Sequence, residues 1–170
     1  MSEGTLIDFT LLFNRFKKPL FNYACKITGS EVLSEDICQN VFIKLYHNLN
    51  NIRNSEAVEF WIFTTCRNEI FDHFRKKKKR IEESIESNDK RISTESLYDD
   101  FEKKELIELI EEELKGMDSS QSEVYYLKEY SGLSYREIAG IMGITEDLVR
   151  SRIFKVRQKL KRAIIKSERG

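Results

Sequence analysis

Hydrophobic positions in this chain recur at spacings of three and four residues, and no stretch alternates strictly between apolar and polar residues. That spacing is the period of a helix with one apolar face, so the sequence predicts an all-α protein. Five helices are expected before residue 133, running from Leu6 to Gly29, Ser30 to Leu49, Glu56 to Lys79, Phe101 to Gly116 and Val124 to Gly132.

Local signals mark several of the helix ends. Gly29 can take the left-handed conformation that ends a helix, and Ser30 can cap the next one. Ser55 and Glu56 follow the polar segment 48–54 and are expected to start the third helix. Pro19 falls inside the first helix, where proline removes a hydrogen bond and clashes with the preceding turn, so we expect a kink or an interruption there.

The segment from residue 134 to residue 160 organises the rest of the chain. Ser134 and Glu137 form a capping box that starts a short helix. Gly143 permits a tight left-handed turn, and Thr145 can cap a second helix. Ala139 supplies a small residue where the second helix would cross the first. This pattern predicts a helix-turn-helix unit, whose second helix enters the major groove of DNA.

The second helix of that unit is apolar on one stripe and basic elsewhere. Its stripe consists of Val149, Ile153, Val156, Leu160 and Ile164. Between Leu148 and Arg169, nine Lys or Arg residues stand against one acid, a local charge of +8 that attracts phosphate. A solvated basic face on an ordinary bundle helix is the alternative interpretation, but the helix-turn-helix spacing favours DNA binding.

The formal net charge of +0 hides a strong segregation of charge along the 170 residues. Residues 75–80 are six consecutive bases, whereas residues 82–113 hold thirteen acids and four bases, a net charge of −9. Residues 82–96 are polar and lack periodicity, which predicts a flexible linker. We therefore expect domains at 1–80 and 101–170, joined by an acidic linker at 81–100. Acids such as Glu111, Glu112 and Glu113 are expected to compete with phosphate for the basic helix.

Other classes of protein lack support in the sequence. No apolar run approaches the ~20 residues of a membrane span, and the N-terminus does not resemble a secretory signal, so we expect a cytoplasmic protein without membrane insertion. The sequence shows no catalytic triad, metal cluster or phosphate-binding glycine loop. We therefore expect no enzyme activity, no cofactor, no metal and no small-molecule substrate.

Three cysteines, Cys25, Cys38 and Cys66, are widely spaced and fit neither a zinc site nor a disulfide scaffold. They are expected to be small buried hydrophobic residues. A thiol sensor is the alternative, although no basic or pairing neighbour marks a reactive thiolate in the sequence.

The third predicted helix has two interpretations. Its aromatic residues, Phe60, Trp61, Phe63, Phe71 and Phe74, are interleaved with Arg67, Asn68, Asp72 and Arg75. Most of these rings are expected in the core, because a three-helix bundle of this size has little else to bury. The same composition, followed by a basic tail, also suits stacking on unpaired bases of a single strand.

Two motif sets resemble one family, the bacterial RNA polymerase sigma factors of the extracytoplasmic-function (ECF) group. Residues 35–45 resemble the family's polymerase-binding helix, and residues 61–75 resemble its helix that recognises and melts the downstream promoter element. Residues 132–152 resemble the segment that contacts the upstream element. The chain departs from the family pattern at several positions, among them Cys66, where alanine is usual.

The resemblance implies promoter-specific transcription initiation with core RNA polymerase and promoter DNA as partners, and it leaves an anti-sigma factor open as a third partner. The implied polymerase-binding residues are Glu35, Asp36, Gln39, Asn40 and Lys44. Those implied for the downstream element are Trp61, Arg67, Asn68, Asp72, Arg75 and Lys76. Those implied for the upstream element are Ser134, Tyr135, Glu146, Asp147, Arg150, Ser151, Arg152, Lys155 and Arg157.

Two other functions remain open at this point. The chain could be a stand-alone repressor or activator that binds paired half-sites as a dimer. It could also be an interaction adaptor whose helix-turn-helix has lost DNA binding, although the charge of +8 argues against that.

Overall fold

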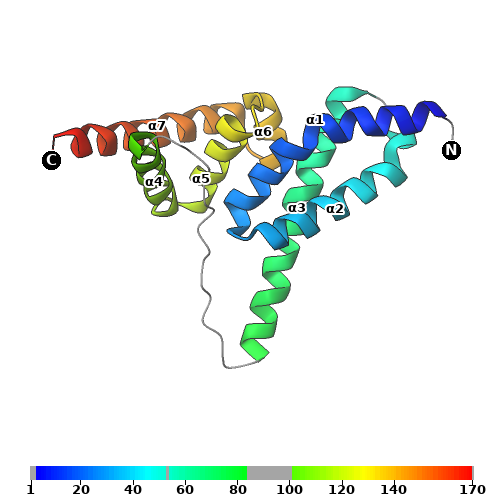
Figure 1. Cartoon of the computed structure of the whole chain (residues 1–170), viewed down its shortest axis with the longest axis horizontal. Coiled ribbons are helices and arrows are strands. Elements are labelled where there is room, and N and C mark those ends of the chain that lie inside the picture. The colour runs from blue at the N-terminus through cyan, green and yellow to red at the C-terminus, as the bar shows by residue number, and fades with distance from the viewer. Residues whose placement is uncertain (1–2, 53, 84–100, 170) are drawn as a thin grey trace. The chain divides into compact units, whose positions relative to one another are not determined.

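The computed structural model describes residues 3–52, 54–83 and 101–169, and within these residues it contains helices and no strand. The all-α prediction is therefore confirmed. The chain divides into two compact units, one within residues 1–94 and the other within residues 95–170, each with its own core (Figure 1). Residues 84–100 of the predicted linker lie outside the described residues, so the boundaries at 81 and 100 stay predictions.

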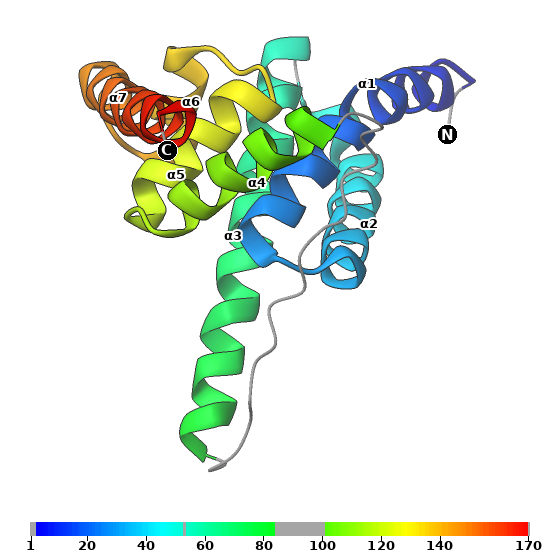
Figure 2. The same ribbon diagram turned by 60° about the vertical axis from the view of Figure 1, so that its left-hand side comes forward.

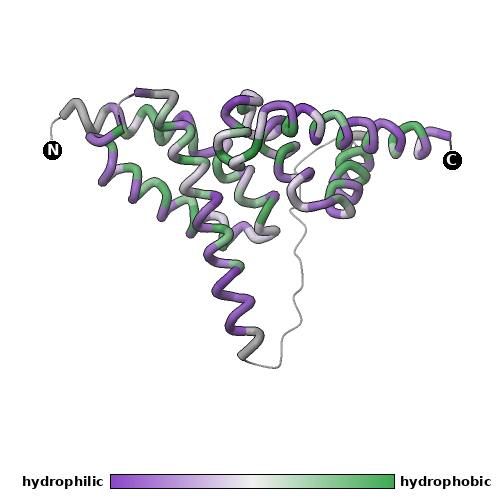
Figure 3. Tube along the Cα trace, turned by 180° about the vertical axis from the view of Figure 1, so that it is seen from behind, coloured by the Kyte–Doolittle hydropathy of each residue, from purple (hydrophilic) through white to green (hydrophobic). Residues whose placement is uncertain are grey.

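The first unit is a three-helix bundle of α1 (Glu3–Thr28), α2 (Glu31–Asn48) and α3 (Ser55–Glu83), with a 3₁₀ turn, η1 (Leu49–Asn51), after α2. Each of the three helices packs against the other two. The second half of α3 extends past α1 and α2 (Figure 2). That extension is hydrophilic and carries the run of six bases (Figure 3).

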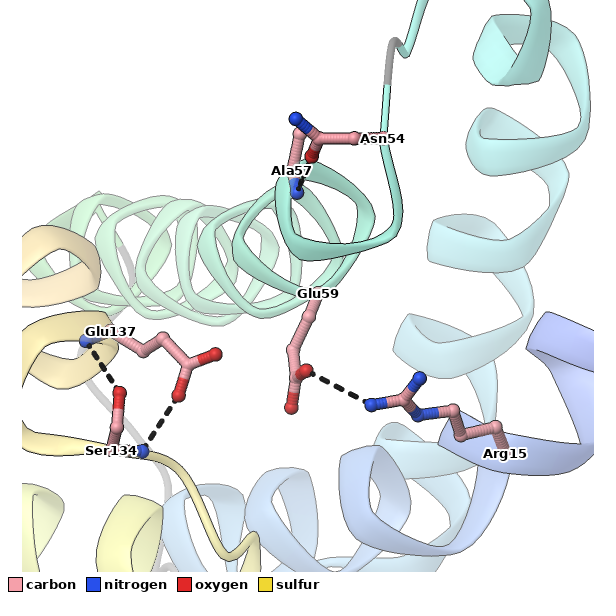
Figure 4. A network of polar contacts seen from close by, with 6 residues as sticks. All are labelled: Arg15, Asn54, Ala57, Glu59, Ser134 and Glu137. Atoms are coloured by element: carbon pink, nitrogen blue, oxygen red, sulfur yellow. Dashed lines mark hydrogen bonds and ion pairs between the residues drawn. The ribbon is translucent and has the colours of Figure 1, made fainter.

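Helix ends in the first unit follow the predicted signals with one shift. Gly29 has a φ of 68°, and Ser30 accepts a hydrogen bond from the Leu33 N–H, as expected. The cap of α3 is Asn54, whose side-chain oxygen accepts from the Ala57 N–H at 2.7 Å (Figure 4). The helix therefore starts at Ser55, as predicted, with its cap one residue earlier.

Of the two outcomes predicted at Pro19, a kink or an interruption, the interruption is absent, because α1 is continuous from Glu3 to Thr28. Phe16 and Leu20 are both buried on either side of the proline. Burying two large apolar side chains stabilises a helix by about 3–6 kcal/mol, which is enough to offset a proline penalty of ~3 kcal/mol.

The second unit contains α4 (Phe101–Lys115), α5 (Ser119–Tyr125), a five-residue π-helix, η2 (Tyr126–Tyr130), α6 (Tyr135–Met142) and α7 (Glu146–Glu168). Helix α7 packs against α4, α5 and α6 (Figure 1). Its predicted stripe is buried at Val149, Ile153, Val156 and Leu160, whereas Ile164 is only partly buried.

The predicted helix-turn-helix geometry is confirmed. Ser134 accepts a hydrogen bond from the Glu137 N–H at 3.2 Å, and its own N–H donates to the Glu137 carboxylate at 2.7 Å (Figure 4). Gly143 has φ 65° and ψ 36°. Thr145 accepts from the Leu148 N–H at 3.2 Å and so caps α7. The turn thus lets α7 pack across α6.

Candidate functional site

The solvent face of α7 presents the cations that the sequence pointed to. Arg150, Ser151, Lys155 and Arg157 are exposed, because the buried stripe turns the opposite side of the helix outward. Phe154 lies on the same side and is 63% exposed, a residue that the sequence analysis missed. Its position in the sequence could have indicated this exposure. Phe154 lies four residues after Arg150, on the same face of the helix, and directly after the buried Ile153.

Arg150 is held by two neighbours. Its guanidinium carbon lies 5.0 Å from the centroid of the Tyr135 ring, and a terminal nitrogen lies 3.5 Å from the Glu146 carboxylate. The structure therefore brings together three residues that the sequence predicted separately, at the N-terminal end of the recognition helix.

Arg157 and Lys159 are paired with acids of their own unit. Arg157 donates to the Glu129 carboxylate of η2 at 2.6 Å, and this hydrogen bond raises the pKa of Arg157. Lys159 lies 3.7 Å from Glu113 of α4. One of the acids expected to approach the basic helix does so, and Glu129 makes a similar contact from outside the predicted acidic stretch.

The remaining residues predicted to contact the upstream element differ in solvent exposure and in whether their polar groups already have a partner within the protein. Asp147 is exposed in the first turn of α7, while the Ser134 hydroxyl is occupied by the helix cap. Arg152 is only partly exposed, and its charge acts on Asp118, the cap of α5. The pKa of Asp118 is lowered mainly by the Ser120 hydroxyl that donates to it, with a smaller contribution from Arg152.

The predicted polymerase-binding strip lies on one exposed side of α2. Glu35, Asp36, Gln39 and Asn40 are all exposed, and Lys44 forms an ion pair with Glu69 of α3. Two large apolar residues of α2, Val32 and Ile43, are also exposed, at 72% and 56%. Sequence reasoning missed both, although neither belongs to the inward-facing set of the helix.

An apolar groove of about 830 Å³ runs beside this strip on the first unit. Residues of α1 and α2 line it, and they include Phe9, Phe13, Phe42, Tyr46 and Ile43. The aromatic rings that line the groove pack edge to face, as Phe13 and Phe42 do, with 4.8 Å between their ring centroids. Glu35 and Gln39 of the strip also line it, so the strip and the groove form one continuous surface.

The predicted downstream-element residues lie along α3. Asn68, Asp72, Arg75 and Lys76 are exposed, with Asp72 and Arg75 paired at 2.9 Å, and Trp61 and Arg67 are partly exposed.

The expectation that most aromatic rings of α3 belong to the core is wrong. Of the five rings only Phe63 is fully buried, Trp61 and Phe74 are partly exposed, and Phe60 and Phe71 are each 42% exposed. Arg67 lies over the Phe71 ring, with 4.6 Å between its guanidinium carbon and the ring centroid. Phe60 and Phe71 lie off the buried stripe of α3, which includes Ile62, Phe63, Cys66 and Ile70.

All three cysteines are buried, which confirms the predicted packing role. The tertiary structure adds a pairing that the sequence did not reveal, because the Cys38 thiol lies beside the buried Cys66 thiol. That contact and burial raise the pKa of the Cys66 thiol well above its ordinary value. Burial also raises the pKa of Cys25. The thiols with shifted pKa values are therefore protonated at neutral pH.

Among the residues that the structure describes, no group of three or more His, Cys, Asp or Glu side chains could hold a metal ion. No helix in the same part of the chain is long and apolar enough to cross a membrane.

The geometry defines a helix-turn-helix protein with a basic recognition helix and a second helical domain. Comparisons with known families are more specific: residues 12–80 match sigma-70 region 2, and residues 107–160 match sigma-70 region 4. The chain therefore belongs to the sigma-70 family of RNA polymerase sigma factors, in its ECF group. Members of this family are regulatory factors for promoter-specific transcription initiation with RNA polymerase, rather than catalysts.

Individual relatives span most of the chain. The ECF RNA polymerase sigma factor SigM of Bacillus subtilis is 28% identical over 88% of this chain and 91% of its own length. The sigma factor SigZ of the same organism is 27% identical over 90% and 85%. Among solved structures, the sigma factor RpoE of Bartonella quintana, in complex with the anti-sigma factor NepR, shares the fold with a TM-score of 0.78. It is 21% identical and covers 92% of this chain and 96% of that chain.

Proposed function

We propose that this protein binds core RNA polymerase through α2, contacts the upstream promoter element through α7, and helps melt the downstream element through α3. The observation that carries the proposal is the exposed side of α7, on which Arg150, Ser151 and Lys155 follow a confirmed helix-turn-helix turn. The residue pattern of that side suits the major groove, since arginine bonds guanine edges and lysine neutralises phosphate.

At the upstream element, the first turns of α7 would meet base edges. Arg150 would donate to a base, while Lys155 and Arg157 would bind phosphate. Phe154, with 63% of its surface exposed, would contact a thymine methyl group.

At the downstream element, α3 would hold the separated strand. Asn68, Arg75 and Lys76 are exposed along its extension, and Phe71 offers a ring for a base to stack on. The six consecutive bases at 75–80 would follow the backbone of that strand.

The α2 strip, with Asp36, Gln39 and Asn40, would bind core polymerase, and Val32 and Ile43 would supply apolar area to the same contact. A protein that works with polymerase acts in the cytoplasm. An anti-sigma factor would be a further partner, as it is in the complex of the similar RpoE. We also propose that residues 81–100 link the two domains.

Reconstitution with core polymerase tests this function. Asp36→Lys should weaken holoenzyme formation on native gels, whereas Asp8→Lys, the same charge change on α1, should not. Asn68→Ala should still form holoenzyme but open promoters poorly in permanganate footprinting.

Two results would count against the proposal. A chain that fails to bind core polymerase, yet binds paired half-sites as a dimer, would be a stand-alone regulator. Normal promoter opening with Asn68→Ala would remove that residue from the downstream site.

A further inference from the structure

Two cations from two elements of the second unit meet at the side chain of Tyr135, the first residue of α6. The guanidinium carbon of Arg150 lies 5.0 Å from the centroid of its ring, and the Lys128 ammonium lies 5.1 Å from it. The ring thus connects the first residue of α6 with one cation of η2 and one cation of α7.

Such contacts matter because Arg150 is otherwise a mobile surface side chain, 58% exposed. A free arginine loses much of its rotamer freedom when it docks on a base, and a restricted one loses less. The Tyr135 ring on one element and the Glu146 carboxylate one helical turn before Arg150 restrict it before DNA arrives. Cations over an aromatic face are attracted by its quadrupole, so the ring attracts the Arg150 guanidinium and also limits the space that it can occupy.

We infer that Tyr135 is a positioning residue of the upstream site, which aims Arg150 at its base pair through its ring. The inference rests on the proposed function of α7 and gives Tyr135 a role that acts through other side chains. It makes specificity at one base pair depend on a residue outside the recognition helix.

The Tyr135 side chain is not needed for the fold of its own helix. The capping box that starts α6 is formed by Ser134 and Glu137, and Tyr135 lies outside the buried core. Lys128 is anchored to the Leu133 carbonyl oxygen at 3.1 Å, so it contacts the ring from a fixed position on η2. Replacing the tyrosine should therefore leave the unit folded while releasing Arg150.

The test uses full-length holoenzyme, with DNA fragments selected from a library in which the upstream element is randomised. Base preference at each position is measured by sequencing the bound fragments, and affinity is measured on the fragment preferred by the wild type. The variants are Tyr135→Phe, Tyr135→Leu, Arg150→Ala and the double variant Tyr135→Leu/Arg150→Ala. Circular dichroism checks that each variant unfolds at the wild-type temperature.

Arg150→Ala should lose the preference at one base pair. Tyr135→Leu should reduce the preference at that same base pair by about two- to fivefold, the worth of an exposed cation–π contact. Tyr135→Phe keeps the ring, so it should keep this preference. In the Arg150→Ala background, Tyr135→Leu should change no base preference.

The inference is overturned if Tyr135→Leu alters the same base preferences with and without Arg150, or if Tyr135→Phe loses the preference as fully as Tyr135→Leu does. A different result bears on the proposed function instead. If Arg150→Ala changes no preference at any base pair, Arg150 does not contact a base, and the upstream assignment itself is wrong.

Discussion

The guanidinium of Arg157 in α7 donates a 2.6 Å hydrogen bond to the carboxylate of Glu129 in η2. Because phosphate must displace this carboxylate, Glu129→Gln should strengthen binding of the free protein to duplex DNA of any sequence. Freeing one cation should also steepen the dependence of log K on log salt by roughly one unit. Fluorescence anisotropy with a duplex of arbitrary sequence, titrated at several salt concentrations, measures both effects.

The matched control is Glu168→Gln, which removes the same charge at the last residue of α7. It should have a much smaller effect, since an interaction between exposed charges is screened beyond a Debye length of about 8 Å at physiological salt. An equal gain from both substitutions would mean that net charge, and not the Arg157 contact, controls binding.

Phe63 and Phe71 lie on the same helix and differ in burial. Substituting each in turn therefore distinguishes an effect on stability from an effect on DNA contact. Phe63→Ala should destabilise the first unit by about 3–5 kcal/mol, because it empties a fully buried site. Phe71→Ala, at a position 42% exposed, should cost less than about 1 kcal/mol and still impair promoter opening. Urea unfolding followed by Trp61 fluorescence reports on this unit, because Trp61 is the single tryptophan. Comparable losses of stability would place Phe71 in the core.

The capping box of α6 should contribute measurably to the second unit. Ser134→Ala removes the acceptor of the Glu137 N–H and should destabilise the unit by about 1 kcal/mol. Hydrogen exchange of the α6 amides should accelerate accordingly. Ser151→Ala, on the exposed side of α7, is the control and should leave exchange nearly unchanged. Unaltered α6 protection in Ser134→Ala would show that packing on α7 alone maintains the helix start.

The contact between Cys38 and Cys66 predicts a pH dependence of stability. The folded pKa of Cys66 is raised above the ordinary thiol value of 9.0, so the folded state holds its proton more tightly than the unfolded state. The stabilisation is fully present below pH 9 and is lost as the pH rises further, by at most about 1.4 kcal/mol per pH unit. Trp61-monitored unfolding of wild type and Cys66→Ala between pH 7 and pH 10.5 measures the difference. An identical pH dependence in the two proteins would contradict the assignment.

Short-range signals made much of this protein predictable from sequence. The Ser30 cap, the Ser134–Glu137 capping box and the Gly143 turn each act within about four residues, so their residues are adjacent in the sequence. The apolar period of α7 likewise predicted its buried stripe. Local hydrogen bonds and the helical repeat depend little on what lies elsewhere in the fold, and therefore the helix-turn-helix could be predicted in detail.

The π-helix η2 could not be predicted from such local signals. The sequence predicted one continuous helix up to Gly132, but the Ser131 N–H bonds the carbonyl of Tyr126, five residues earlier. Glu129 lies inside this wider turn, and its carboxylate accepts the hydrogen bond from Arg157. The propensities of these residues do not distinguish the two turns, because tertiary packing selects between them.

By itself, the sequence determined the all-helical class, the second helix of the helix-turn-helix unit and the charge of that helix. Only the tertiary structure decided that Phe63 is buried while Phe71 is exposed, and that Tyr135 lies under Arg150. It also joined Glu129 to Arg157, 28 residues apart. The physical reason is the same in each case: a helical period defines the face of a residue, but its partner comes from another helix, whose approach depends on the packing of the whole domain.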